Sequence, residues 1–264
     1  MYRHIVLEQQ GPVATLRLAR PETRNSMTPE MGDEVERACR ELASDTEIRV
    51  VVLTGTGSAF SSGGDLSMLA KDAGLTDRGE MTMIDAPRSF YEKFLAVRRL
   101  PVPTIAAMNG HAIGAGFCLA LACDLRVAVR DAKMGMTFVK LGLHPGMGAT
   151  YFLPRLVGVA QACELFFTGR VIDAVEAERR GIVNTAVPRE EFEERVSALA
   201  REIAGGAPLV LRSLKTAIYR GAERTLDEML EDEAVNQSRT FRTEDAREGI
   251  RAVLEKREPR FRGR

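Results

Sequence analysis

The sequence predicts an α/β fold made of recurring strand–strand–helix units and completed by a helical C-terminal segment. Short apolar, β-branched runs alternate with segments of helical spacing, as expected when helices connect parallel strands. Glycine-rich turns follow two of these runs, at residues 61–65 and 110–116. Further along, the composition changes from strands and glycine to charged helices. We therefore expect a core at 1–195 and a helical oligomerisation segment at 196–264 that packs on the core or on neighbouring subunits.

Length and composition narrow the class of protein. The chain has 264 residues, is 45% hydrophobic and carries no net charge. It can bury a full core and offers no cluster of positive charge for nucleic acid or an anionic membrane. No apolar run reaches the ~20 residues that a membrane-spanning helix needs, and no signal-peptide core precedes the first strand pattern. We expect a soluble, cytoplasmic protein with no nucleic-acid and no membrane partner.

Metal and disulfide sites are not expected. The three histidines are spread through the chain, so neither a metal triad nor a charge-relay triad is supported. Thiols in apolar or helical contexts without CxxC spacing are ordinary in a reducing compartment. The four cysteines fit that description: Cys39, Cys118, Cys123 and Cys163.

The first elements are two strands, a helix and a buried strand. Residues 5–7 and 13–18 flank a Gly-Pro turn, which predicts a hairpin. Thr28 precedes Pro29 and an acidic first turn, the pattern of an N-capped helix. The run IRVVVLT at 48–54 has the composition of a strand covered on both faces.

The middle of the chain contains the stretch around which the fold is organised. Residues 67–88 show no clear period and predict a helical or irregular lid, and helical spacing then covers 90–100. The apolar run at 105–108, a glycine turn and the Leu/Ala-rich segment 117–123 predict a buried strand, a tight turn and a buried helix.

The remaining chain predicts short strands and then helices alone. Strands are expected at 125–129, 133–136 and 182–187, with a Pro/Gly-rich turn at 143–148. Helices are expected at 154–168, 174–180, 190–204, 208–220, 225–239 and 243–256.

The two glycine-rich turns are the candidate site. Each follows an apolar strand, and the second ends where a helix begins, so unpaired N–H groups would face any oxygen placed there. The alternative is a pair of tight connections with small residues for packing. Several common catalytic motifs are absent: GxGxxG, GK[ST], HExxH and GxSxG.

At this point the chain resembles the crotonase family, the enoyl-CoA hydratase/isomerase superfamily. The matching pieces are PETRNSM at 21–27, AFSSGGDL at 59–66, IAAMNGHAIGAGFCLALACD at 105–124, LGLHPGMGAT at 141–150 and LFFTG at 165–169. Further matches lie at 177–183 and 244–261, so the resemblance covers essentially the whole chain.

The resemblance implies a spiral of ββα units, assembled as a trimer or a dimer of trimers. It also implies an acyl-CoA or acyl-carrier thioester substrate, in which coenzyme A belongs to the substrate and no separate cofactor is needed. The family stabilises an enolate oxyanion with two backbone N–H groups, which match Gly64 and Ala115 here. Preorganised donors of this kind are commonly the largest catalytic contribution.

The departures from the family pattern matter for the reaction. Family hydratases use two glutamates as acid and base, and these positions hold Cys118 and Phe138 here. A thiol in an apolar helix disfavours its thiolate, and phenylalanine has no proton to give. The resemblance therefore does not predict ordinary hydration.

Other residues are candidates for proton transfer. Asp65 and His144 match positions near the pocket, although Asp65 more often holds its loop and a lone loop histidine is more often solvated. His111 is expected to be a structural donor. Four further side chains could reach the pocket from its rim or lid, and the sequence does not select among them: Lys140, Glu80, Asp85 and Tyr91.

By the same resemblance, eight residues are candidates for binding the substrate: Arg24, Ser26, Ser62, Gly63, Leu66, Pro145, Gly146 and Phe261. Arg24 would meet a phosphate, or else be an ordinary surface charge. Phe261, with Arg262, would reach the adenine end from a neighbouring subunit.

The function expected is that of an enzyme of the enoyl-CoA hydratase/isomerase group, acting on an acyl thioester through an enolate. One alternative is decarboxylation, because residues 137–150 also resemble crotonase-type decarboxylases and loss of CO₂ forms an enolate without a carboxylate base. The other is a non-enzymatic acyl-CoA binding protein that kept the pocket.

Overall fold

The computed structural model describes residues 1–72 and 85–264. Most of the segment expected to form a lid, including Glu80, therefore lies outside the described residues, as does the side chain of Asp85. The two described flanks are helices, α2 (Leu66–Asp72) and α3 (Asp85–Phe94). Helix α3 thus begins before residue 90, where the sequence predicted helical spacing to return.

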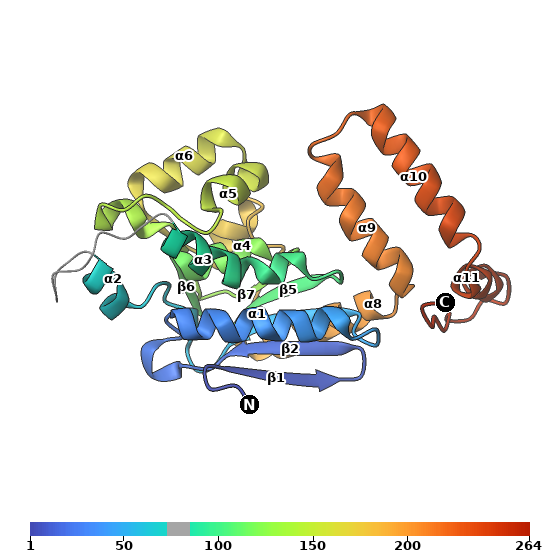
Figure 1. Ribbon diagram of the computed structural model, residues 1–264, viewed down its shortest axis with the longest axis horizontal. Helices are drawn as coiled ribbons and strands as arrows, with labels where there is room; N and C mark the ends of the chain where they lie inside the picture. The colour runs from blue at the N-terminus through green and yellow to red at the C-terminus, as the bar shows by residue number, and fades with distance from the viewer. Residues whose placement is uncertain (73–84) are drawn as a thin grey trace.

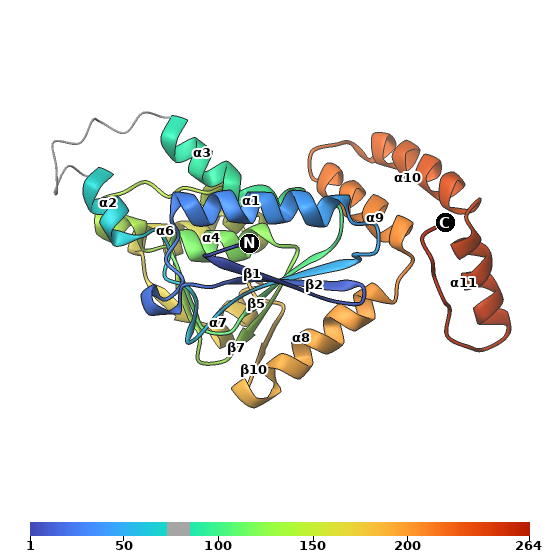
Figure 2. The same ribbon diagram turned by 60° about the horizontal axis from the view of Figure 1, so that its bottom comes forward.

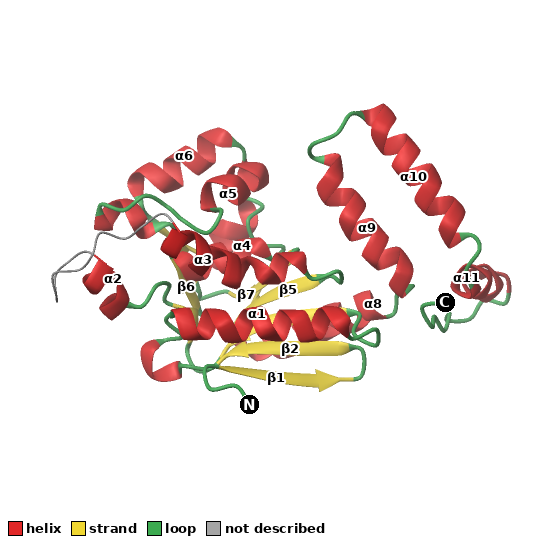
Figure 3. Ribbon diagram, in the orientation of Figure 1, coloured by secondary structure: helices red, strands yellow, loops and turns green. Residues whose placement is uncertain are grey.

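Ten strands of the described chain form two sheets (Figure 3). The larger has the order β1-β2-β3-β5-β7-β10 and the smaller the order β4-β6-β8-β9. The larger sheet contains β1 (Ile5–Gln10), β2 (Val13–Leu18), β3 (Val50–Gly55), β5 (Thr104–Met108), β7 (Leu125–Val129) and β10 (Thr185–Val187). The smaller contains β4 (Ala59–Ser61), β6 (His111–Ile113), β8 (Lys133–Gly135) and β9 (Val171–Asp173).

Consecutive strands alternate between the two sheets, which produces the predicted spiral. From β3 to β8, each odd-numbered strand pairs in the larger sheet and the following even-numbered strand in the smaller one. All neighbours among these strands are parallel. The α/β class with recurring ββα units is therefore confirmed.

The N-terminal hairpin and first helix form as predicted. Strands β1 and β2 are antiparallel, and β2 alternates buried and half-buried residues, so that Ala14, Leu16 and Leu18 face the core. Helix α1 (Pro29–Ser44) begins after Thr28, whose hydroxyl accepts a hydrogen bond from the Met31 N–H at 3.3 Å. The cap and the proline at the first position define where the helix starts.

Helix α4 (Ala115–Ala122) lies at the centre of the molecule. Every residue of this helix is buried, so it has no polar face and packs on all sides. Helix α1 covers one face of the larger sheet, with α3 packed on α1, and α8 (Arg189–Ala204) covers the other face (Figure 2). Helix α4 packs against β4, β5 and β6 and against α5, and these contacts fix its position.

The chain from β8 to β10 passes through four short helices: η3 (Thr137–Leu141), α5 (Ala149–Val157), α6 (Val159–Thr168) and α7 (Ala174–Arg179). The single helix predicted at 154–168 is wrong, because Gly158 separates α5 from α6 with φ +78. Strands β4, β6 and β9 and helix η3 lie where the sequence analysis predicted turns or no element. Each has only three to five residues, too few for a visible period.

The C-terminal helices extend away from the sheets. Helices α9 (Pro208–Gly221) and α10 (Leu226–Thr240) form an antiparallel pair, and α11 (Glu244–Leu254) lies beyond them, at the right in Figure 1. Thr225 forms a complete capping box with Glu228, and Thr243 caps α11. The boundary expected at residues 195 and 196 falls inside α8, which packs on the larger sheet.

Candidate active site

The two glycine-rich turns meet at the beginning of α4. A β-carbon on Gly116 would lie 2.6 Å from the Ser61 carbonyl oxygen and 2.6 Å from its Cβ. One on Gly63, whose φ is +94, would lie 2.6 Å from the Ile113 carbonyl oxygen and 3.3 Å from the Ala115 nitrogen. Only glycine permits this approach, so the glycines bring residues 61–65 against the first turn of the buried helix.

The N–H groups of Gly64 and Ala115 have no acceptor within the described part of the chain. Ala115 is the first residue of α4, where an N–H has no partner inside the helix. Gly64 forms an isolated parallel bridge with Met27, in which Met27 N–H donates to the Gly63 carbonyl at 2.8 Å and Asp65 N–H donates to the Met27 carbonyl at 3.1 Å. That bridge uses the groups on either side of the Gly64 N–H.

Asp65 is held by its own hydrogen bonds. Its carboxylate accepts from the Ser26 hydroxyl at 2.8 Å and from the Arg20 guanidinium at 3.4 Å, and Ser67 N–H donates to its other oxygen at 3.1 Å. The Ser26 hydrogen bond, above all, lowers the pKa of Asp65. A carboxylate fixed in this way orders the loop that carries Gly64 and is a poor base.

Cys118 and Phe138 do not provide an acid or a base. Cys118 is fully buried in α4, its Sγ lies 3.8 Å from the Met136 Sδ, and burial raises its thiol pKa to about 12. The Phe138 ring lies over Gly114, 3.7 Å from where a β-carbon would stand. The residue before Ala115 is therefore covered by an apolar ring, and the Cys118 thiol in the same helix stays neutral.

The segment from 143 to 148 carries the remaining pocket candidates. Gly146 is half-buried, and the Tyr91 hydroxyl fills the place where a side chain at Gly146 would begin. His144 is exposed, and its Nδ1 lies 2.8 Å from the Pro145 carbonyl oxygen. His144 is therefore open to solvent.

Some substrate-binding candidates lie near the turns. Arg24 is exposed and has φ +55, and its carbonyl accepts from Ser62 N–H at 2.9 Å. Leu66 is 75% exposed at the start of α2. Both side chains are therefore exposed beside the turn at residues 61–65.

Phe261 and its own chain's turns lie far apart. Its carbonyl oxygen accepts from Arg49 at 2.8 Å, and its ring lies on Gly249. Figure 1 shows the C-terminus and α2 at opposite ends of the molecule. Within one chain, Phe261 does not take part in the site, and its contribution from a neighbouring subunit stays a prediction.

The chain is similar to known enzymes along nearly its whole length. The family model for enoyl-CoA hydratase/isomerase matches residues 8–264. The chain belongs to the enoyl-CoA hydratase/isomerase family. It is 35% identical to the short-chain-enoyl-CoA hydratase of Clostridium acetobutylicum, over 96% of this chain and 95% of that protein. It is 34% identical to the crotonyl-CoA hydratase of Syntrophomonas wolfei, over 98% of each.

Solved structures of enoyl-CoA hydratases have the same fold as this chain. The enoyl-CoA hydratase of Bacillus anthracis superposes with a TM-score of 0.91 at 35% identity, covering 99% of this chain and all of that one. The crotonase fold and the membership of an enzyme family are thus established. Within residues 1–72 and 85–264 there is no cluster of His, Cys, Asp and Glu that could hold a metal ion, and no described helix is long and apolar enough to cross a membrane.

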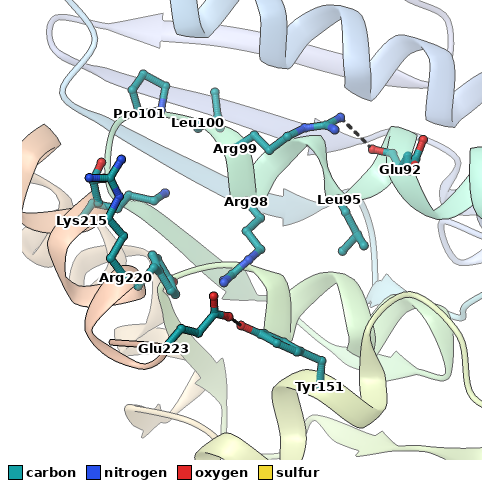
Figure 4. Close-up of a pocket in the computed structure, with 12 residues that line it drawn as sticks. Glu92, Leu95, Arg98, Arg99, Leu100, Pro101, Tyr151, Lys215, Arg220 and Glu223 are labelled. Atoms are coloured by element: carbon teal, nitrogen blue, oxygen red, sulfur yellow. Dashed lines mark hydrogen bonds between the residues drawn. The ribbon is translucent and has the colours of Figure 1, made fainter. Parts of the chain in front are cut away.

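Sequence reasoning did not predict a cavity that lies away from the two glycine-rich turns. A cavity of about 640 Å³ lies between η2 (Leu95–Arg99), α5 and α9. Figure 4 shows Arg98 pointing into it toward Glu223, which accepts a hydrogen bond from Tyr151 at 3.1 Å. None of the predicted site residues lines this cavity, so it is separate from the candidate active site.

Proposed function

We propose that this protein acts on acyl-CoA or acyl-carrier thioesters through an enolate, whose oxygen accepts hydrogen bonds from the Gly64 and Ala115 N–H groups. The observation that carries the proposal is the approach of Gly63 to the Ala115 nitrogen at the beginning of the buried helix α4. Two preorganised donors beside apolar side chains favour a developing negative charge, and each is worth ~2.7–4 kcal/mol in related sites.

The side chains around these donors favour reactions that need no strong carboxylate base. Cys118 stays neutral, Phe138 is apolar, and Asp65 is engaged by Ser26. Ordinary hydration, in which two carboxylates act as acid and base, is therefore expected to be slow. The absence of a carboxylate at both positions favours decarboxylation as a second candidate, because loss of CO₂ forms the enolate directly.

Titration with crotonyl-CoA and with a malonyl-type CoA thioester, followed by product analysis, tests the proposal. A hydrated product supports a hydratase function, and release of CO₂ supports a decarboxylase function. Tight binding without turnover of either thioester would contradict an enzymatic role and leave an acyl-CoA binding protein.

We propose further that the protein assembles as a homotrimer or hexamer through its C-terminal helices. These helices expose apolar side chains that a lone chain would leave in water, among them Leu214, Ile218, Leu226, Leu230, Ile250, Val253 and Leu254. Light scattering on the eluting protein should give at least three copies. A well-behaved monomer at micromolar concentration would contradict the proposed assembly and the proposal that Phe261 contributes to a site shared between subunits.

A further inference from the structure

Tyr91 places its hydroxyl at the candidate site from a separate element. It belongs to α3, and a β-carbon on Gly146 would lie 2.5 Å from its Oη and 2.6 Å from its Cζ. The phenol therefore occupies the space that a side chain at residue 146 would need. Phe138, which lies over Gly114 before the beginning of α4, belongs to the same 137–148 segment as Gly146. Tyr91 therefore packs against the segment that carries Phe138.

The other candidates for proton transfer are engaged or lie elsewhere. Asp65 is fixed by Ser26 and Arg20. Both His144 and Lys140 are exposed. Cys118, in α4, is fully buried. Tyr91 is thus the one half-buried hydroxyl among these described candidates that adjoins the segment facing Ala115.

The Tyr91 hydroxyl has the properties of a proton donor. The hydroxyls of Tyr151 and Tyr219 donate hydrogen bonds to Glu223 and Asp124. Within the described residues, the Tyr91 Oη has no such partner. Burial, with a smaller contribution from the Cys118 thiol, raises the pKa of Tyr91. A phenol with a raised pKa keeps its proton at neutral pH and is available to donate it.

Resting on the proposed function, we infer that Tyr91 is a catalytic residue whose hydroxyl delivers the proton to the α-carbon of the enolate. It would supply the proton-donating group that the family's carboxylates supply at positions 118 and 138. The element that carries it, α3, lies outside the motifs through which the family is recognised in this chain.

The step balances for either source of the enolate. The Tyr91 O–H bond breaks as a C–H bond forms at the α-carbon, and the enolate electron pair supplies that bond while the thioester carbonyl re-forms. In hydration, the phenolate regains its proton from the water molecule whose oxygen has bonded to the β-carbon, so one water is consumed. In decarboxylation, the phenolate regains it from solvent, and CO₂ leaves.

The test compares Tyr91→Phe with Tyr151→Phe, a matched loss of one phenol hydroxyl outside the candidate site. In D₂O, the kcat for whichever thioester the wild type converts should fall by ~10²–10⁴ in Tyr91→Phe, the range for losing a general acid. KM should stay close to that of the wild type. The single-sided placement of deuterium at the α-carbon should be lost, whereas Tyr151→Phe should resemble the wild type in all three measurements.

The outcomes separate this inference from the function on which it rests. Unchanged kcat and unchanged deuterium placement in Tyr91→Phe, with the wild type active, would overturn the role of Tyr91 alone. A wild type that converts neither thioester would overturn the proposed function and Tyr91's role with it. If Tyr91→Phe does not fold, Gly146→Ala serves instead, because its β-carbon displaces the phenol ring and should reduce kcat in the same way.

Discussion

Gly63 lies directly against Ala115: a β-carbon on Gly63 would stand 3.3 Å from the Ala115 backbone nitrogen. The two residues belong to different ββα units: Gly63 follows β4, and Ala115 follows β6. Strands β4 and β6 are parallel neighbours, so their ends lie at the same edge of the smaller sheet. This pairing is what places Gly63, the residue before Gly64, beside the first residue of α4.

Replacement of Ala115 by proline should remove one of these donors with little disturbance of the fold. Proline is well tolerated at the first position of a helix, and Ala115 occupies that position in α4 behind Gly114. We expect kcat to fall by ~10²–10³, the usual cost of losing one such donor. Val159→Pro is the matched control, because Val159 begins α6 behind Gly158 and should leave kcat unchanged. Full activity in folded Ala115→Pro would contradict the role of this N–H.

Replacement of Cys118 and Phe138 by glutamate should raise the hydration of crotonyl-CoA. The wild type is expected to hydrate it weakly, since general acid–base groups each typically supply ~10²–10⁴ in rate. Phe138 is only half-buried and should accept a carboxylate, whereas the sealed position of Cys118 will raise the pKa of a glutamate there. Circular dichroism must show that the variant with glutamate at both positions is folded. A fast wild-type rate, unchanged in Cys118→Ala and Phe138→Ala, would show that other groups run the hydration.

The hydrogen bond between Ser26 and Asp65 should stabilise the protein in a pH-dependent way. Since this bond lowers the folded-state pKa of Asp65, its contribution is present above the unfolded pKa of about 3.9 and is lost as pH falls through the folded pKa. Ser26→Ala should therefore lower the free energy of unfolding by ~1.5–3 kcal/mol at pH 7 and by less in acid. Urea unfolding at both pH values measures this, with the exposed Ser67→Ala as control. An equal loss at both pH values would argue against the assignment.

The buried ion pair between Lys215 and Asp124 fastens α9 to the core. The Lys215 Nζ lies 2.8 Å from Asp124 and donates to the Val102 carbonyl at 2.9 Å. Lys215→Met leaves the Asp124 carboxylate, whose side chain is 18% exposed, without its cation, so the free energy of unfolding should fall by up to ~3–5 kcal/mol. Lys133→Met removes an exposed partner of Asp173 and should cost no more than ~1 kcal/mol. Equal effects of the two substitutions would mean that the buried pair does not stabilise α9.

Local patterns predicted the elements but not the contacts between them. The N-cap at Thr28 and the apolar run of α4 are visible in the sequence because cap chemistry and continuous burial act within one element. The free N–H of Ala115 follows from the same reasoning. By contrast, the meeting of Tyr91 with Gly146 depends on how α3 packs across the 137–148 segment. The hydrogen bond from Ser26 to Asp65 and the ion pair at Lys215 likewise join residues far apart in the chain, and such contacts give no periodic signal in the sequence.

The central claim is that the Gly64 and Ala115 N–H groups polarise a thioester carbonyl. The ¹³C NMR shift of a carbonyl-labelled, non-reactive acyl-CoA tests it most directly. On binding to the wild type, the carbonyl resonance should move downfield, and on binding to Ala115→Pro at saturation it should move clearly less. A resonance that does not move on binding, or that moves equally with both proteins, would contradict the account.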